Sequence, residues 1–261
     1  MSDDIAQVSK YVASATLAPI QAGQYSRAQV LQAVEDRGKY LGEPGDDGAA
    51  MVAGTLVSVL ANLTGLNRRD VANSLEFSTR VAMREVGDNQ NTAEYWVAFT
   101  RAILQIGWFR QFDQWSSDFI NGSTTGAANF SDYVIENVRN DPLYSAAERE
   151  IVIRSLESLR SQAEKRAFFR QFTASGTRGS FGVNAATVTN GALAMRFSAF
   201  AFACSAVVDD YLIFSIRNIT ASVQRNNVDV AANQRTIDSV RNQLEDRLDQ
   251  AAGDFIDSVE I

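Results

Sequence analysis

The sequence contains no histidine and only one cysteine, Cys204. Histidine is the commonest general base and transition-metal ligand, so zinc hydrolases, histidine-containing triads and haem sites lose their usual residues. A single cysteine also excludes a disulfide bond within the chain. The sequence therefore predicts no catalytic residue, no metal site and no cofactor, and leaves a covalent fatty acid as the one group that the chain could carry.

Basic residues are also scarce, with 24 Lys and Arg against 31 Asp and Glu and a net charge of −7. Binding to nucleic acid requires a basic surface that neutralises phosphates, and the sequence has no basic stripe of that kind. Docking on an anionic membrane by charge alone is disfavoured for the same reason. We therefore predict that nucleic acid is not a partner.

The sequence predicts neither a secretory signal nor a membrane-spanning segment. The N-terminus begins with Asp3 and Asp4 and lacks the cationic region and apolar core of a secretory signal. No run of about 18 uncharged apolar residues is present, because Arg196 interrupts residues 191–208, the nearest candidate. We expect synthesis as a soluble cytoplasmic protein, and membrane association or export without a signal stays open.

The least polar part of the chain is residues 191–223. The period-two pattern from residue 193 to 208 is apolar on both faces, which predicts a strand that is covered on both sides. Asp209 and Asp210 suit a tight turn to a second strand, from residue 211 to 223. A long alanine-rich helix is the alternative, and the near absence of charge disfavours it. A two-stranded hairpin is marginal alone, so helices should cover it.

The remaining sequence predicts helices. Residues 49–63 form an uncharged apolar run that favours a buried central helix, and short strands flank a glycine-rich turn at residues 175–180. Ser145 and Glu148 form a capping box. Helical spacing or caps predict further helices over residues 3–18 (ended by Pro19), 26–38, 68–86, from Asn91 or Thr92 through Trp108, 131–140, from 145 through 159, and from about 233 to the end.

These patterns predict an α+β protein that is mostly helical, with a small antiparallel sheet around the hairpin in the C-terminal third and a terminal amphipathic helix. We treat residues 1–261 as a single domain, in which residues 1–48, ending in a loop over 42–48, could form a looser helical lead-in.

Cys204 is the first candidate site. A buried cysteine is most often a small core residue. The functional alternative is a lipid acceptor, because its neighbours Phe200 and Phe202 would suit an acyl chain. A catalytic thiol is disfavoured, since the chain has no histidine and no nearby cation to activate it.

An aromatic cluster is the second candidate site. It consists of Trp108, Phe109, Phe112, Trp115 and Phe119. Large aromatic side chains are commonly core residues, but they also dominate partner-binding patches and membrane interfaces. We therefore take Trp108, Phe112 and Trp115 as candidate lipid- or partner-binding residues, with core packing as the alternative.

The layout and the segment FAFACSAVV, which contains Cys204, together resemble the Evf type of bacterial virulence factor. The shared layout is a helical N-terminal part, a late apolar β segment with a cysteine and a terminal helix. The resemblance implies an α/β fold with an interwoven topology, palmitoylation of Cys204 and action at membranes or on a host.

Three functions follow as hypotheses. The first is a non-enzymatic interaction or virulence-type protein with a hydrophobic groove, which could be acylated on Cys204 and act at membranes. The second is a self-assembling structural protein that uses the apolar hairpin and the C-terminal helix as subunit contacts. The third is an enzyme that handles acyl groups or lipids through Cys204, which the lack of histidine makes the weakest of the three. The partners would be lipid, a protein or a second copy of the chain.

Overall fold

The structure is a computed structural model that describes residues 2–18, 41, 44–52, 54–87, 92–122 and 126–258. Pro19 and the helix expected over residues 26–38 lie outside these ranges. The α+β class predicted from the sequence is confirmed, but the sheet is larger than expected and mixed, with seven strands.

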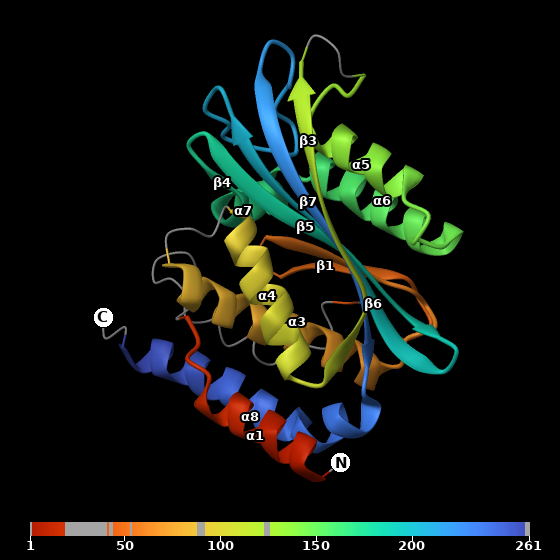
Figure 1. The fold of residues 1–261 in the computed structure, drawn as a ribbon, viewed down its shortest axis with the longest axis vertical. Helices are drawn as coiled ribbons and strands as arrows, with labels where there is room; N and C mark the ends of the chain where they lie inside the picture. The colour runs from red at the N-terminus through yellow and green to blue at the C-terminus, as the bar shows by residue number, and fades with distance from the viewer. Residues whose placement is uncertain are drawn as a thin grey trace.

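The sheet has the strand order β1-β2-β5-β6-β7-β3, and β4 pairs with β5 at the side (Figure 1). The β2–β5 pair is parallel and the other pairs are antiparallel. The strands are β1 (Gly48–Val52), β2 (Thr55–Val59), β3 (Trp108–Asn121), β4 (Ala174–Ser175), β5 (Arg178–Thr189), β6 (Ala192–Cys204) and β7 (Thr220–Ala232). The helices are α1 (Ser2–Ser14), α3 (Gly65–Val86), α4 (Ala93–Gln105), α5 (Phe130–Asn140), α6 (Ala146–Ser161), α7 (Ala163–Thr173) and α8 (Gln234–Ser258).

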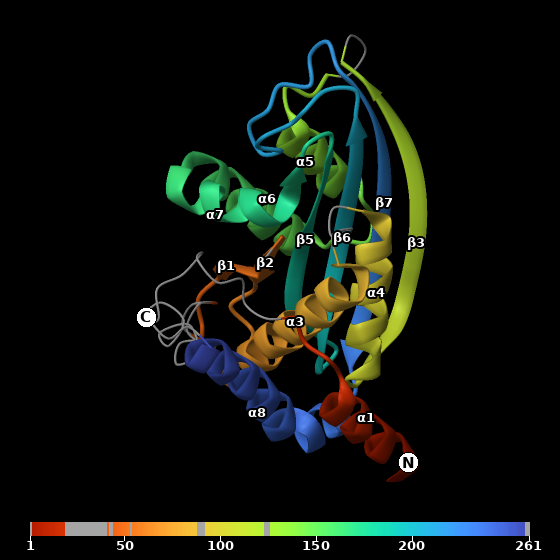
Figure 2. The ribbon, with the colours of Figure 1, turned by 90° about the vertical axis from the view of Figure 1, so that its left-hand side faces the viewer.

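Helices cover both faces of the sheet. Figure 2 shows α6 and α7 on one side of β5 and β6, and α4 on the other. Each face carries its own apolar core, one around Phe200 and Phe130 and the other around Phe197 and Phe99. The first and last helices lie side by side, because α1 and α8 are joined by hydrogen bonds such as Ser9 Oγ to Gln243 Oε1 at 2.7 Å.

Several predicted helix boundaries are confirmed because they rest on local signals. Ser145 and Glu148 form the capping box at the start of α6, with the Ser145 N–H donating to Glu148 Oε2 at 2.7 Å. Thr92 precedes α4, and Gly87 ends α3 with a positive φ of 57°. The apolar stripe of α8 is also confirmed as buried, and it comprises Ile237, Val240, Leu244 and Leu248.

The central helix predicted over residues 49–63 is wrong, because this segment forms the β1–β2 hairpin. All five residues of β2 are buried, so the strand lacks the polar alternation that usually reveals one. Its β-branched residues Thr55, Val57 and Val59 favour a strand, and Gly54 sits at the turn against the backbone of Phe172. The apolar run therefore reflects a strand that is buried on both faces, and not a helix.

The predicted hairpin at residues 191–223 is half confirmed. Its first strand is β6, with most residues of both faces buried. The tight turn at Asp209 and Asp210 is wrong, because residues 205–219 form a long connection and the second strand, β7, begins at Thr220. Asp210 instead accepts the N–H of Leu212 on its carboxylate at 3.0 Å and pairs with Arg166. Three apolar residues of this connection, Tyr211, Leu212 and Ile216, fill the core as part of a folded loop, whereas Ile213 is exposed.

The aromatic segment after α4 forms β3 instead of extending the helix to Trp108. Gly107 has a positive φ of 104°, which allows the sharp change of direction between α4 and β3. The strand pairs with β7 on one side only and is an edge of the sheet. A bulge between Arg110 and Phe112 shifts the alternation of side chains along it.

Candidate functional site

Cys204 ends β6 on the face covered by α5, α6 and α7. Its thiol is half-buried and lies 3.6 Å from the hydroxyl of Tyr211. Burial raises the pKa of the Cys204 thiol above its ordinary value, and the hydrogen bond with Tyr211 only partly opposes that change. A raised pKa leaves little thiolate at neutral pH, so the site is poorly suited to nucleophilic catalysis.

The two phenylalanines predicted beside an acyl chain are core residues. Phe200 and Phe202 are buried and stack on each other with ring centroids 6.3 Å apart. Phe202 also stacks on Tyr211, with ring centroids 5.3 Å apart. The ring of Phe130 contacts the rings of Phe202 and Tyr211. These side chains fill the space between the sheet and the helices, so they do not line an open groove.

The surfaces that the self-assembly hypothesis assigned to subunit contacts are also occupied. The apolar stripe of α8 is buried by α1 and α3, and the apolar faces of β6 are buried by the helices on both sides. The chain itself therefore covers both surfaces.

The aromatic cluster divides into buried and exposed members. Trp108 is buried, and its indole N–H donates to Ser74 Oγ at 3.0 Å. Phe112 is half-buried, whereas Phe109, Trp115 and Phe119 are 48%, 40% and 70% exposed. Core packing therefore explains Trp108, and an external role remains available to the others.

Strand β3 is the most exposed strand of the sheet. Residues 114–119 are exposed or half-buried on both faces, and α5 reaches this part of the strand through Tyr133. Its side-chain anchors are few and polar, such as the Tyr133 hydroxyl donating to Asp118 at 2.6 Å and the Asn226 amide donating to Asp113 at 2.8 Å. The strand thus presents aromatic side chains next to an unpaired backbone edge.

Further large apolar side chains are exposed at the same end of the sheet. The C-terminal end of β3 pairs with the start of β7, at Asn121 and Thr220. The connection between β6 and β7 projects from this end, and it exposes Val207 by 58% and Ile213 by 49%. We call Phe119, Val207 and Ile213 the apolar end of the molecule; Trp115 lies farther along β3, opposite Asn226 in the middle of β7.

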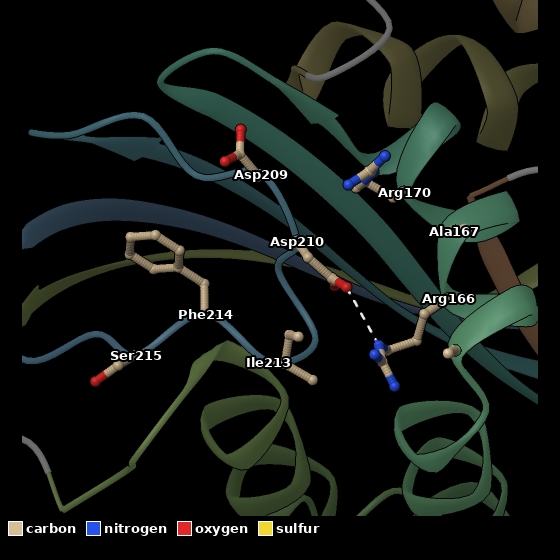
Figure 3. A pocket seen from close by; sticks show the side chains of 9 residues that line it. Arg166, Ala167, Arg170, Asp209, Asp210, Ile213, Phe214 and Ser215 are labelled. Carbon is tan, nitrogen blue, oxygen red and sulfur yellow. Dashed lines mark hydrogen bonds and ion pairs between the residues drawn. The ribbon is translucent and has the colours of Figure 1, made fainter.

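An open cleft of about 510 Å³ lies between α7 and the β6–β7 connection (Figure 3). Arg166 and Arg170 line it from α7, and Arg166 Nε lies 3.3 Å from Asp210 Oδ2. The Asp210–Arg166 ion pair ties the connection to the helix, so the acidic pair predicted as a hairpin turn holds the loop in place. Asp209 is exposed beside it.

A group of charges that the sequence analysis did not connect is enclosed between the sheet and α6. Arg196 makes a two-pronged ion pair with Asp229, at 2.5 and 2.9 Å, and also contacts Glu148 at 3.1 Å. Its guanidinium lies 5.5 Å from the centre of the Tyr144 ring. Burial lowers the pKa of Arg196, but the two carboxylates outweigh it and the pKa is raised. Arg196 pairs with both acids, so this cluster is a structural contact rather than a reactive site.

The signal for the buried charges was present in the sequence. Arg196 is the one charge in an apolar strand, and Asp229 stands between two valines. What was missing was the pairing of β6 with β7, which places the two residues opposite each other. Among the described residues, no group of three or more Cys, Asp and Glu could hold a metal ion.

No protein-family model and no curated protein matches the sequence. Among solved structures, the chain is similar to the Evf virulence factor with 10% identity and a TM-score of 0.39, covering 84% of this chain and 90% of that one. It is also similar to a delta-endotoxin with 13% identity and a TM-score of 0.40, covering 83% and 91%. Its distant structural neighbours are thus a virulence factor and a toxin. Within the described ranges, no helix has the length and apolar content needed to span a membrane.

Proposed function

We propose that this protein has a non-enzymatic binding function and attaches to the interface of a lipid bilayer through its apolar end. The observation that carries the proposal is the exposure of Trp115 and Phe119 on the edge strand β3. Exposed aromatic side chains are costly in water and are favoured at the boundary between lipid headgroups and acyl chains. Val207 and Ile213 add apolar surface at the same end.

The charge of the chain decides which membrane it would bind. A net charge of −7 opposes attraction to anionic lipids, so binding must come from apolar burial. We therefore expect binding to neutral, zwitterionic vesicles with little dependence on salt.

The test is co-sedimentation with phosphatidylcholine vesicles. We expect the natural protein to bind and the double variant Trp115→Ser/Phe119→Ser to bind about tenfold or more weakly, since two large apolar side chains are lost. Trp96 and Trp108 are buried, so a blue shift of tryptophan fluorescence on binding reports Trp115. The matched control is Leu66→Ser, which removes a side chain that is 48% exposed at the start of α3. Equal binding of the double variant would contradict the proposal.

Self-assembly is the second candidate, because the outer edge of β3 is unpaired in a strand of 14 residues. Long exposed edges pair readily with another strand. Sedimentation velocity of the lipid-free protein distinguishes the two functions. A monomer that binds vesicles supports membrane attachment, whereas a concentration-dependent dimer that ignores vesicles supports assembly.

Acylation of Cys204 is the finer form of the membrane proposal. Its thiol is half-buried beside Tyr211 near the apolar end, and it is the only thiol in the chain. We expect the intact mass of the natively expressed protein to exceed the sequence mass by one fatty-acyl group, and neutral hydroxylamine to remove the excess. An unmodified mass from the native source would leave Cys204 as a packing residue.

A further inference from the structure

A second cleft, of about 610 Å³, opens between β3, β7 and α5 on the face opposite α4. Phe112 and Gln114 line it from β3, and Arg225 and Asn227 line it from β7. The other wall comprises Tyr133, Glu136, Asn137, Asn140, Asp141, Pro142 and Leu143, from α5 and the turn after it. The cleft is thus built mainly from amides, carboxylates and aromatic rings.

The floor of the cleft is held by a hydrogen-bonded network. The Asn227 amide donates to Asp141 Oδ2 at 2.7 Å, and the Arg225 guanidinium donates to Asn137 Oδ1. Asn137 in turn donates its amide to the Tyr133 carbonyl at 2.8 Å. These contacts come from β7 and α5 together, so the polar groups are fixed in position before any ligand arrives.

Two polar atoms of that network have no partner among the described residues. They are Oδ1 of Asn227, a residue that is only 8% exposed, and Nε of Arg225. Unpaired buried polar atoms cost stability, and proteins rarely keep them without a reason. Both atoms are closed off from solvent, so they belong to the polar floor beneath the cleft and not to its open surface.

The rim of the cleft has unused polar groups as well. Gln114, Glu136 and Asn140 are exposed, and none has a side-chain partner in the part of the chain that the structure describes. The half-buried rings of Phe112 and Tyr133 stand among them and offer flat apolar surfaces. Together these residues offer donors, acceptors and stacking surfaces in one cleft.

The chemistry of the lining selects the class of ligand. The carboxylates of Glu136 and Asp141 repel an anion, and the single cation, Arg225, is already bonded to Asn137. A purely apolar ligand would leave the amides unpaired. Hydroxyl groups both donate and accept hydrogen bonds, so a ligand rich in hydroxyls can satisfy amides and carboxylates together. Its C–H faces can lie on the aromatic rings.

We propose that the cleft between β3, β7 and α5 binds a neutral saccharide. Gln114, Glu136 and Asn140 hydrogen bond its hydroxyls at the rim, and Phe112 and Tyr133 pack against its ring. Asn227 and Arg225 form the polar floor that holds the cleft in shape. This site is separate from membrane attachment, because it rests on polar groups that the bilayer proposal does not use.

The test is saturation-transfer NMR with a panel of glucose, galactose, mannose and N-acetylglucosamine, with N-acetylneuraminic acid as the anionic member. We expect at least one neutral sugar to bind and the anionic sugar to bind more weakly. Gln114→Ala and Glu136→Gln should each weaken binding by about tenfold, since the first removes a hydrogen-bonding amide and the second replaces a charged acceptor with a weaker neutral one. Both residues are exposed, so these variants should fold normally.

Matched controls are Gln171→Ala on α7 and Glu157→Gln on α6, two exposed residues outside the cleft, and neither should change binding. A panel without any binder overturns the proposal, as does binding that both cleft variants leave unchanged. Stronger binding of the anionic sugar would also overturn it. Vesicle binding by the Glu136→Gln variant should equal that of the natural protein, which keeps the two functions distinguishable.

Discussion

Replacing Arg196 with methionine should lower the free energy of unfolding by about 3 kcal/mol, because the substitution leaves two mostly buried carboxylates without their cation. Asp229 and Glu148 have side chains that are 14% and 7% exposed, so water does little to solvate them. The loss corresponds to a fall in the thermal midpoint on the order of 10 °C. Urea denaturation followed by circular dichroism measures it.

An exposed ion pair provides the matched control for Arg196. Arg154 contacts Asp47 at 2.6 Å, but the two side chains are 57% and 42% exposed. Arg154→Met should therefore cost no more than about 1 kcal/mol. If both variants lost the same small amount, the Arg196 cluster would not be a buried structural contact. Adding Asp229→Leu and Glu148→Gln to Arg196→Met should recover much of the stability, because no unpaired charge then remains.

Phe200→Ala should destabilise the protein by about 3–5 kcal/mol, because it opens a cavity in the core between the sheet and α5, α6 and α7. Phe200 is fully buried and its ring contacts Phe181, Phe202 and Tyr133 at centroid distances of 6.1–6.3 Å. The same urea denaturation measures the change. A groove that admits solvent or an acyl chain would make the substitution far less costly, so the experiment separates the two roles considered for this residue.

Phe119→Ala is the control for Phe200. It truncates the same side chain where 70% of it is exposed, and it should change stability by no more than about 0.5 kcal/mol. Comparable losses for the two variants would mean that Phe119 also packs in a core. The expected contrast separates phenylalanines that maintain the fold from those that are available to a membrane.

Local features of the sequence were sufficient for several helices, although not for α7, which was not predicted. The capping box at Ser145 and Glu148, the glycine at position 87 and the apolar stripe of α8 all act within a few residues, so they could be recognised without knowledge of the fold. The strand β6 was also predictable, since its length and its lack of charge left few alternatives. The predicted strand ran to residue 208, whereas β6 ends at Cys204.

Contacts between distant parts of the chain decided the rest. β2 is buried on both faces, so its sequence alone cannot be distinguished from that of a buried helix. The pairing of β2 with β5 is what makes it a strand. β7 contains the polar run from Gln224 to Asn227, so the sequence pattern does not predict a strand there. The strand forms because β3 and β6 pair with it on either side. Neither pairing can be read from local periodicity, because a strand is completed by residues far away in the sequence.

The candidate sites depended on the same long-range contacts. The bulge in β3 places Trp108 and Phe112 on opposite faces of the sheet, so aromatic residues with similar spacing have different roles. The saccharide cleft joins residues 112–114 with residues 225–227 through the pairing of β3 with β7. The sequence by itself determined several helix boundaries, the charge and the scarcity of catalytic groups, since these depend on nearby residues or on composition. Only the tertiary structure decided which aromatic rings face water and which polar groups meet, because both depend on strand order and register.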